Sequence, residues 1–154
     1  MRILLQRVKY ASVKVDGEVI ASIDDGILAL VGFCEGDRDE YILPMAQKLA
    51  GLRIFEDENE KMNLSVSDIG GRILAVSQFT LYADCSHGRR PSFVNALKPD
   101  LASGYYELFV EKLGEITGTK IETGKFGADM KVELLNDGPV TIVLDSQDIV
   151  HTKI

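Results

Sequence analysis

Cysteine and histidine are both scarce in this chain of 154 residues, which contains two of each. Cys34 and Cys85 are far apart and form no CxxC pair, which argues against a disulfide scaffold or a cysteine-rich zinc site. His87 and His151 belong to no HExxH or His-x-His pattern, so a zinc site built on histidines is also disfavoured. We therefore expect no bound metal, and free thiols fit a reducing compartment.

Long apolar runs and net positive charge are absent too. Hydrophobic residues make up 45% of the chain, yet no run approaches the roughly 20 residues that cross a bilayer. The segment "MRILLQRVKYASVKV" alternates into charge too early for a signal peptide, so we expect a soluble, cytoplasmic protein with no membrane partner. The formal net charge is -7, which disfavours DNA as a partner and limits any nucleic-acid contact to a local surface.

The length and the even spread of apolar residues predict one domain, residues 1–154, with one substantial core. Residues 2–33 contain apolar segments with strand periodicity, separated by Asp16-Gly17 and by Asp24 to Gly26. Asp-Gly between such segments is a strong hairpin signal. These residues therefore predict a three-stranded antiparallel meander.

Two later segments have helical periodicity. In the first, Asp37 and Glu40 offer a capping box, while Pro44 indicates that the helix begins late or kinks. The second helix is expected between Pro99 and Gly118. The apolar faces consist of Ile42, Met45, Ala46 and Leu49 in the first helix, and of Leu101, Tyr105, Leu108, Phe109, Leu113 and Ile116 in the second.

Further strands are expected in both halves of the chain. Residues 53–66 indicate a short strand, a charged turn and an irregular return, and Gly70-Gly71 precedes a buried strand. Other strands are predicted around 120–122, 130–135 and 140–144. Strands distributed around two principal helices indicate a compact, single α+β domain with mainly antiparallel pairing.

The common catalytic motifs are missing. No GxGxxG, P-loop or GxSxG sequence is present, so dinucleotide, NTPase and hydrolase-elbow interpretations have no support, and no cofactor is expected. His87 follows Cys85 and Ser86 closely enough to suggest a nucleophile with its base, but neighbours in a loop seldom present side chains to one another. We interpret this segment as a polar surface loop, and His151 as part of a frayed tail.

Two other segments suggest a site. Ser77, Gln78 and Thr80 interrupt an apolar strand in "SQFTLYAD". Because buried polar groups must be hydrogen-bonded, these residues either hold the fold together or line a pocket. Gly138-Pro139, in "NDGPVTIVLDS", is either an ordinary trans turn or a cis bond, which X-Pro sequences allow. The residues alone leave both alternatives open.

Taken together, these segments resemble one family. "SQFTL" at residues 77–81 and "NDGPVT" at residues 136–141 resemble the two signature motifs of D-aminoacyl-tRNA deacylase in its bacterial and eukaryotic form, formerly D-tyrosyl-tRNA(Tyr) deacylase. The segments "QRVKYASVKVDGEV", "LRIFEDENEKMNLSV", "RRPSF" and "TGKFGADMKVELLNDGPVT" resemble family segments in the same order. The resemblance therefore covers nearly the whole chain.

The resemblance implies an enzyme that hydrolyses the ester between a D-amino acid and the terminal adenosine of tRNA, a chiral proofreading step in translation. It implies glycyl-tRNA as a further substrate. The implied fold is a compact α+β domain with an antiparallel, barrel-like sheet, and the implied assembly is a homodimer with its active sites at the interface. The partner is then the 3′ acceptor end of aminoacyl-tRNA.

In this family the Gly-Pro of the second motif is cis and reaches into the active site of the other subunit. The resemblance thus places Gly138 and Pro139 opposite the first motif of the other subunit, as a rigid backbone wall that rejects L side chains. Either the Thr80 hydroxyl attacks the ester, or the ribose 2′-hydroxyl assists while main-chain N–H groups hold the oxyanion; we favour the second mechanism. The first motif consists of Ser77, Gln78, Phe79 and Thr80.

Other positions follow from the same resemblance. Phe126 and Met130 would form part of the pocket for the terminal adenosine, with ordinary core packing as the alternative. Arg7 would brace the Gly-Pro loop by hydrogen-bonding its backbone, with a solvated charge on an edge strand as the alternative.

Local positive charge is also available for RNA phosphates. Arg89, Arg90 and Lys125 would supply it.

A rival interpretation is a non-catalytic dimeric RNA-binding module of the same fold. The two intact motifs favour the enzyme, because a binding module has no need of a chiral wall beside a reactive ester.

Overall fold

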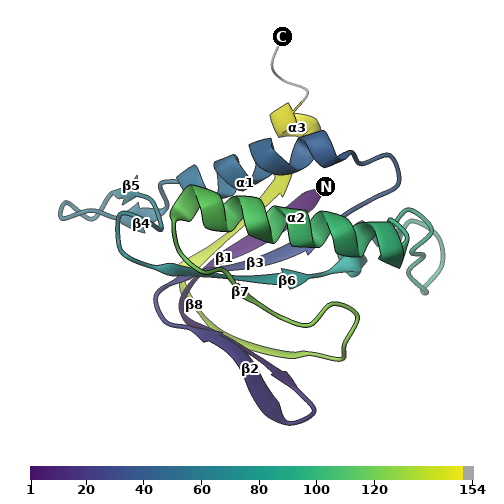
Figure 1. Cartoon of the computed structure of the whole chain (residues 1–154), viewed down its shortest axis with the longest axis horizontal. Helices are drawn as coiled ribbons and strands as arrows, with labels where there is room; N and C mark the ends of the chain where they lie inside the picture. Colours follow the sequence, from purple (N-terminus) through teal and green to yellow (C-terminus); the bar gives the residue numbers. More distant parts are fainter. Residues whose placement is uncertain (151–154) are drawn as a thin grey trace.

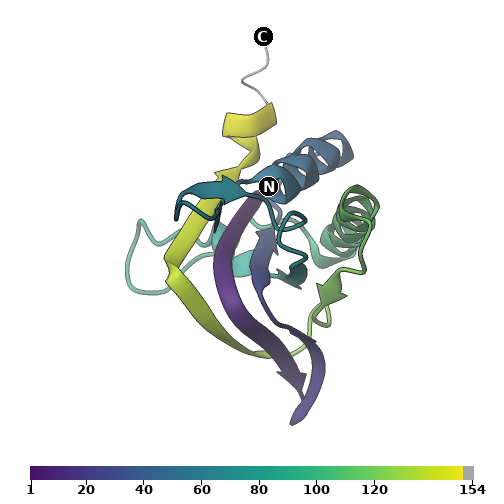
Figure 2. The same cartoon turned by 90° about the vertical axis from the view of Figure 1, so that its left-hand side faces the viewer.

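The computed structural model describes residues 1–150, which form a curved six-stranded sheet, a small two-stranded sheet and several helices. α1 (Ile42–Gly51) and α2 (Pro99–Thr117) lie side by side across one face of the large sheet, and the short α3 (Ser146–Val150) follows the last strand (Figure 1). Figure 2 shows the strands curving into a nearly closed, barrel-like wall. The α+β class and the two principal helices are confirmed, while His151 lies outside the described residues.

β1 (Arg2–Val15) is the central strand of the large sheet. β2 (Glu18–Ile23) and β3 (Gly26–Gly32) both pair antiparallel with one edge of β1, and the register continues from one to the other. The chain reverses at Asp16-Gly17, where both residues have positive φ, but Asp24-Asp25 only interrupts the strand. The predicted three-stranded meander is therefore wrong, because these residues form one long, bent hairpin.

β8 (Lys131–Asp145) pairs antiparallel with the other edge of β1 along nearly its whole length. The register shifts between Gln6 and Tyr10, opposite the segment that contains Gly138 and Pro139. The two strands predicted on either side of that dipeptide are thus the two arms of one strand, which the Gly-Pro loop interrupts.

The remaining strands of the large sheet pair in parallel. β6 (Arg72–Ser77) lies beside β3, and β7 (Glu122–Thr123) lies beside β6. Alternate residues of β3 and β6 belong to hydrophobic clusters on opposite faces of the sheet, which explains why both strands are continuous apolar runs. β4 (Phe55–Glu56) and β5 (Met62–Leu64) form the small sheet, as the short strand and its return predicted.

The start of α1 agrees with the sequence in one respect and differs in another. A short 3₁₀ turn, η1 (Asp39–Tyr41), precedes α1, so Pro44 occupies the third helical position, where its missing N–H removes no helical hydrogen bond. Of the two predicted alternatives, a late start or a kink, the structure shows the late start. The predicted capping box is wrong, because the Asp37 carboxylate instead accepts hydrogen bonds from the α-amino group of Met1 and the main-chain N–H of Cys34.

α2 begins at Pro99 and ends before Gly118, whose φ of 68° is left-handed, as predicted. Its buried face is rotated relative to the predicted one, because Leu101 and Ile116 are exposed while Ala102 and Tyr106 are buried. Among residues 1–150, no helix combines the length and the apolar character that crossing a membrane requires.

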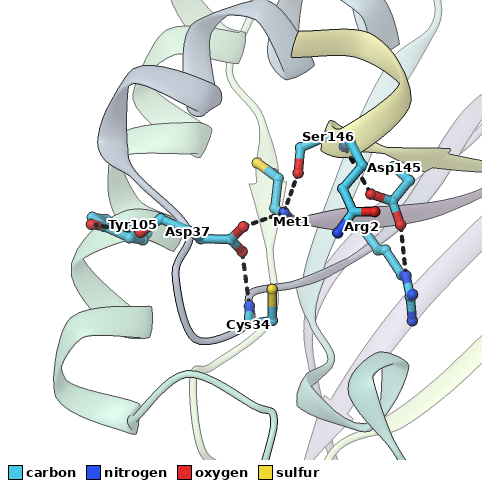
Figure 3. Close-up of polar contacts among 8 residues, drawn as sticks. Met1, Arg2, Cys34, Asp37, Tyr105, Asp145 and Ser146 are labelled. Carbon is cyan, nitrogen blue, oxygen red and sulfur yellow. Dashed lines mark hydrogen bonds and ion pairs between the residues drawn. The ribbon is translucent and has the colours of Figure 1, made fainter. Parts of the chain in front are cut away.

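A polar cluster fixes the start of β1. The α-amino group of Met1 lies 2.6 Å from Oδ1 of Asp37 and 2.6 Å from Oγ of Ser146 (Figure 3). The main-chain N–H of Ser146 donates back to the carbonyl of Met1 at 2.9 Å. Since Met1 and Ser146 are almost fully buried, this cluster joins the first strand, the last helix and the turn before α1.

Candidate functional site

A cavity of about 410 Å³ lies at the carboxyl ends of β3 and β6. Parallel strands end at the same edge of a sheet, and such edges commonly form binding crevices. The first motif reaches this edge because Ser77 is the last residue of β6 and the Gln78 N–H donates to the Val31 carbonyl at 2.7 Å. Ser77, Gln78 and Phe79 all line the cavity.

The first motif continues into a short 3₁₀ turn, η2 (Phe79–Tyr82). The N–H of Leu81 donates to the carbonyl of Gln78, and the N–H of Ala83 donates to that of Thr80. The turn packs directly on Gly32 at the end of β3, where an added Cβ would lie 2.7 Å from the Gln78 carbonyl oxygen. Glycine is therefore needed at position 32 for η2 to approach the sheet.

Thr80 is exposed, and its hydroxyl accepts a hydrogen bond of 2.5 Å from Nε2 of Gln78. Within residues 1–150, no carboxylate or imidazole is hydrogen-bonded to Thr80. The polar residues of the motif thus combine both alternatives considered above: Ser77 and Gln78 line the cavity, and the Gln78 amide holds the motif together.

The two residues assigned to an adenosine pocket lie in different surroundings. Phe126 lines the cavity and packs against Tyr106, with ring centroids 6.1 Å apart. Burial raises the pKa of the Tyr106 phenol, whose hydroxyl donates to the Ala75 carbonyl. Met130 instead packs against the cluster on the other face of the sheet, with its sulfur over Gly124. The structure therefore brings Phe126, but not Met130, to the first motif.

The Gly138-Pro139 peptide bond is cis, as the resemblance implies for this motif, and both residues are exposed. Asn136 closes the loop, since its side-chain oxygen accepts from the Val140 N–H at 2.8 Å and its amide donates to the Val140 carbonyl at 3.3 Å. The sequence reasoning missed this role. An asparagine two residues before a Gly-Pro turn was the available signal, because Asn side chains often bond to nearby backbone.

Arg7 supports the same loop from β1. Its Nε donates to the Asp137 carbonyl at 2.9 Å and its Nη1 donates to the Ile54 carbonyl at 2.7 Å. Only 5% of the Arg7 surface is exposed, so it is not the solvated edge-strand charge considered as the alternative. A buried guanidinium with two carbonyl partners fixes the backbone immediately before Gly138.

The loop and the cavity are distant within one chain. β1 and β3 lie between β8 and β6 in the sheet. The strand registers place Ser77 level with Leu144, several residues along β8 from Pro139. Among the described residues, neither Gly138 nor Pro139 lines the cavity.

One basic residue lines the cavity, and three others were assigned to RNA phosphates. Lys98 lines it, although the sequence analysis assigned this residue no role. Arg89, Arg90 and Lys125 are exposed, and within residues 1–150 none of the three forms an ion pair. Their charges are available to an anion.

The segment around His87 is an exposed loop, as predicted. The expectation that its side chains do not meet is wrong, because Oγ of Ser86 lies 2.7 Å from Nδ1 of His87. Oγ also donates to the Asp84 carboxylate, and hydrogen bonds from Ser86 hold the pKa of that carboxyl below its usual value. Because the carboxylate engages the serine and not the other ring nitrogen, the three residues do not form a triad. Residues 1–150 contain no group of three or more metal-ligating side chains.

Comparisons with known proteins identify the family. A family model described as D-Tyr-tRNA(Tyr) deacylase matches residues 4–145. The chain belongs to this deacylase family. Proteins named D-aminoacyl-tRNA deacylase are similar over nearly their full length: the one from Geobacillus sp. (strain WCH70) is 56% identical, covering 99% of this chain and 100% of its own, and the one from Listeria innocua is 54% identical, covering 97% and 99%.

Solved structures support the same family fold. One, titled "c-Myc DNA Unwinding Element Binding Protein", is 42% identical with a TM-score of 0.88, covering 94% of this chain and 98% of its own. Another, titled as a probable eukaryotic D-amino acid tRNA deacylase, has a TM-score of 0.80 at 18% identity, covering 93% and 97%. The second likeness concerns the fold alone.

Proposed function

We propose that this protein hydrolyses the ester bond of D-aminoacyl-tRNA and releases free tRNA and the D-amino acid. The observation that carries the proposal is the position of the first motif at the cavity, in a chain whose relatives are deacylases over their full length. No carboxylate or histidine is among the described residues that line this cavity. The reaction therefore relies on main-chain groups and on the substrate itself.

The oxyanion of the tetrahedral intermediate is held by main-chain N–H groups of Phe79 and Thr80. Preorganised N–H donors are effective there because they need no reorganisation as charge develops. The 2′-hydroxyl of the terminal ribose assists the attack, which agrees with the absence of a base beside Thr80 in residues 1–150. An unassisted threonine hydroxyl is a weak nucleophile.

Selection against L-amino acids is made by the second motif of a partner subunit in a homodimer. Gly138 and Pro139 are exposed, are braced by Arg7 and do not line the cavity of their own chain, which supports delivery to another subunit's site. A backbone wall obstructs an L side chain and leaves a D side chain room toward solvent. Glycine has no side chain to obstruct, so glycyl-tRNA is a second substrate.

The acceptor end of tRNA is the binding partner, in the cytoplasm. Phe126 at the cavity contributes to the adenosine pocket, whereas Met130 packs on the other face of the sheet and is left out of it. Arg89, Arg90 and Lys125 contact phosphates, since each is exposed and unpaired among the described residues. Such contacts would make binding weaken as salt concentration rises.

The proposal is tested by incubating the protein with D-tyrosyl-tRNA and L-tyrosyl-tRNA in parallel and following deacylation. Rapid release of D-tyrosine alone is expected. Equal rates on the two substrates would exclude the chiral wall, and tRNA binding without release would favour the non-catalytic RNA-binding module. Duplex DNA added as a competitor is expected to leave the rate unchanged. A fully active monomer in light scattering would exclude a site shared between subunits.

A further inference from the structure

The guanidinium of Arg2 connects the last strand with the first motif. Arg2 is the first residue of β1, and its Nε donates to Oδ2 of Asp145 at 2.9 Å, as Figure 3 shows. Its Nη1 donates to the main-chain oxygen of Leu81 at 3.0 Å. The guanidinium carbon also lies 4.6 Å from the ring centroid of Tyr82, within the range of a cation–π interaction. Two of these contacts are with η2.

The contact with Leu81 satisfies a group that the turn itself leaves unpaired. The last carbonyls of a helical turn have no partner within the turn, and a cation beside them is favourable. Gly32 is the cross-strand partner of Arg2, and its missing side chain lets η2 approach the end of β3. The cross-strand pair of Arg2 and Gly32 therefore provides both the space that η2 occupies and the cation that holds it.

We propose that Arg2 is a positioning residue of the active site, which keeps η2 in the orientation that aims its main-chain N–H groups into the cavity. Asp145 orients the guanidinium through the Nε hydrogen bond. Arg2 does not line the cavity and acts only through Leu81 and Tyr82. The inference rests on the proposed function, since it assigns the same N–H groups to oxyanion binding.

A purely stabilising role predicts different behaviour. In that case, loss of Arg2 would lower the melting temperature and leave turnover per folded enzyme unchanged. A positioning role predicts a loss of kcat, because an error of about 1 Å in the placement of a catalytic group costs up to about a hundredfold in rate. KM for the tRNA should change little, since Arg2 does not line the cavity and is not one of the basic residues assigned to phosphates.

The chain contains a matched control in Arg72. Its side chain is 40% exposed, against 41% for Arg2, and it also donates to a main-chain carbonyl, that of Lys120, while lying near a carboxylate, that of Glu122. Arg72 is at the opposite end of β6 from Ser77. Arg72→Ala therefore removes the same kind of interaction without affecting η2.

The experiment compares Arg2→Ala, Arg2→Lys and Arg72→Ala by deacylation kinetics on D-tyrosyl-tRNA and by melting temperature. Arg2→Ala should lower kcat at least about tenfold, with KM within about threefold, while Arg72→Ala keeps the wild-type kcat. Arg2→Lys retains the charge but lacks the planar fork, so it cannot reach both acceptors and should also lose kcat. Equal kcat in all three variants and the wild type would overturn the proposal. If Arg2→Ala does not fold, Arg2→Lys decides the question.

Amide hydrogen exchange gives a second readout that needs no activity. The N–H groups of Leu81 and Ala83, which close η2, should exchange faster in Arg2→Lys than in Arg72→Ala. Unchanged exchange overturns the positioning role even if the enzyme is active. A third outcome is faster exchange in Arg2→Lys together with a wild-type protein that deacylates neither D-tyrosyl-tRNA nor L-tyrosyl-tRNA. That outcome supports the role of Arg2 in holding η2 and overturns the proposed function instead.

Discussion

The Nε of Arg7 lies 2.9 Å from the main-chain oxygen of Asp137, so a buried guanidinium supports the residue immediately before Gly138. The same side chain reaches the Ile54 carbonyl at 2.7 Å. Arg7 therefore joins the central strand, the Gly-Pro loop and the segment after α1. The loop is exposed at its tip and rigidly held at its base.

Replacement of Arg7 by lysine should destabilise the protein and disorder the loop. A lysine ammonium is a compact charge that cannot reproduce a fork between two carbonyls. We expect a loss of about 2 kcal/mol in the free energy of unfolding, measured by urea denaturation, because a buried carbonyl loses its partner. Arg38 is exposed and forms an ion pair with Glu40, so Arg38→Lys should differ from the wild type by less than about 0.5 kcal/mol. Equal stability of the two variants would contradict this role.

Gly138→Ala should reduce deacylation at least about tenfold in a folded protein. The residue has a φ of 136°, and an added Cβ would lie 2.9 Å from Cγ2 of Val140 and 3.0 Å from Nη2 of Arg7. Gly17 is a control, since it has a φ of 80° with no atom within 4 Å of such a Cβ. Gly17→Ala should lose stability and keep its activity. Wild-type turnover by Gly138→Ala would count against the second motif as part of the site.

Thr80→Ala should retain much of its activity, because the proposed chemistry uses the main-chain N–H of this residue and not its hydroxyl. The substitution removes a hydrogen bond from Gln78, so a loss of a few fold in kcat is expected, measured by single-turnover deacylation. Circular dichroism should confirm the fold. A correctly folded variant without activity would instead identify the hydroxyl as the nucleophile.

Asp37→Asn should destabilise the protein by about 3 kcal/mol, because it leaves a buried ammonium without its counter-charge. The side chains of Met1 and Asp37 are 1% and 5% exposed. Glu40→Gln removes one partner of the exposed Arg38 pair and should change the free energy of unfolding by less than about 1 kcal/mol. Denaturant titration of both variants separates these outcomes, and similar values would show that the cluster at Met1 adds nothing.

Asp145 should contribute to stability in a pH-dependent way. Burial opposes its ionisation, but hydrogen bonds from Arg2 and the Gln147 N–H outweigh burial and hold its pKa below the ordinary value of 3.8. A carboxyl with a depressed folded pKa stabilises the protein above its unfolded pKa and loses this effect as pH falls through the folded pKa. Asp145→Asn should therefore be less stable than the wild type at pH 7, and the difference should shrink below about pH 4. A constant difference between pH 7 and pH 3 would refute the assignment.

Local sequence signals predicted the helices better than the sheet. Pro44 and Gly118 act on the backbone beside them, so the start of α1 and the end of α2 could be read directly. Asp24-Asp25 was interpreted as a reversal because a turn and a kink use the same residue types. The parallel pairing of β3 with β6 joins segments more than 40 residues apart, and no local pattern specifies it.

Some parts of the candidate site could likewise be predicted from local sequence, and other parts could not. The first motif was found from polar residues in an apolar strand, and the Gly-Pro loop gained its meaning from the family resemblance. Arg2 was missed because its partners Leu81 and Asp145 lie 79 and 143 residues away. Met130 was assigned to the same pocket as Phe126 by the family resemblance, although the chain between them crosses to the other face of the sheet.

β8 carries the Gly-Pro loop in its middle and Asp145 at its end, and it pairs with β1 on both sides of the loop. The number of residues between Pro139 and Asp145 is therefore not free to vary. A one-residue insertion there would turn every following side chain to the opposite face and separate Asp145 from Arg2. Length variation among relatives should instead concentrate in the exposed turn between β4 and β5, which holds no part of either motif.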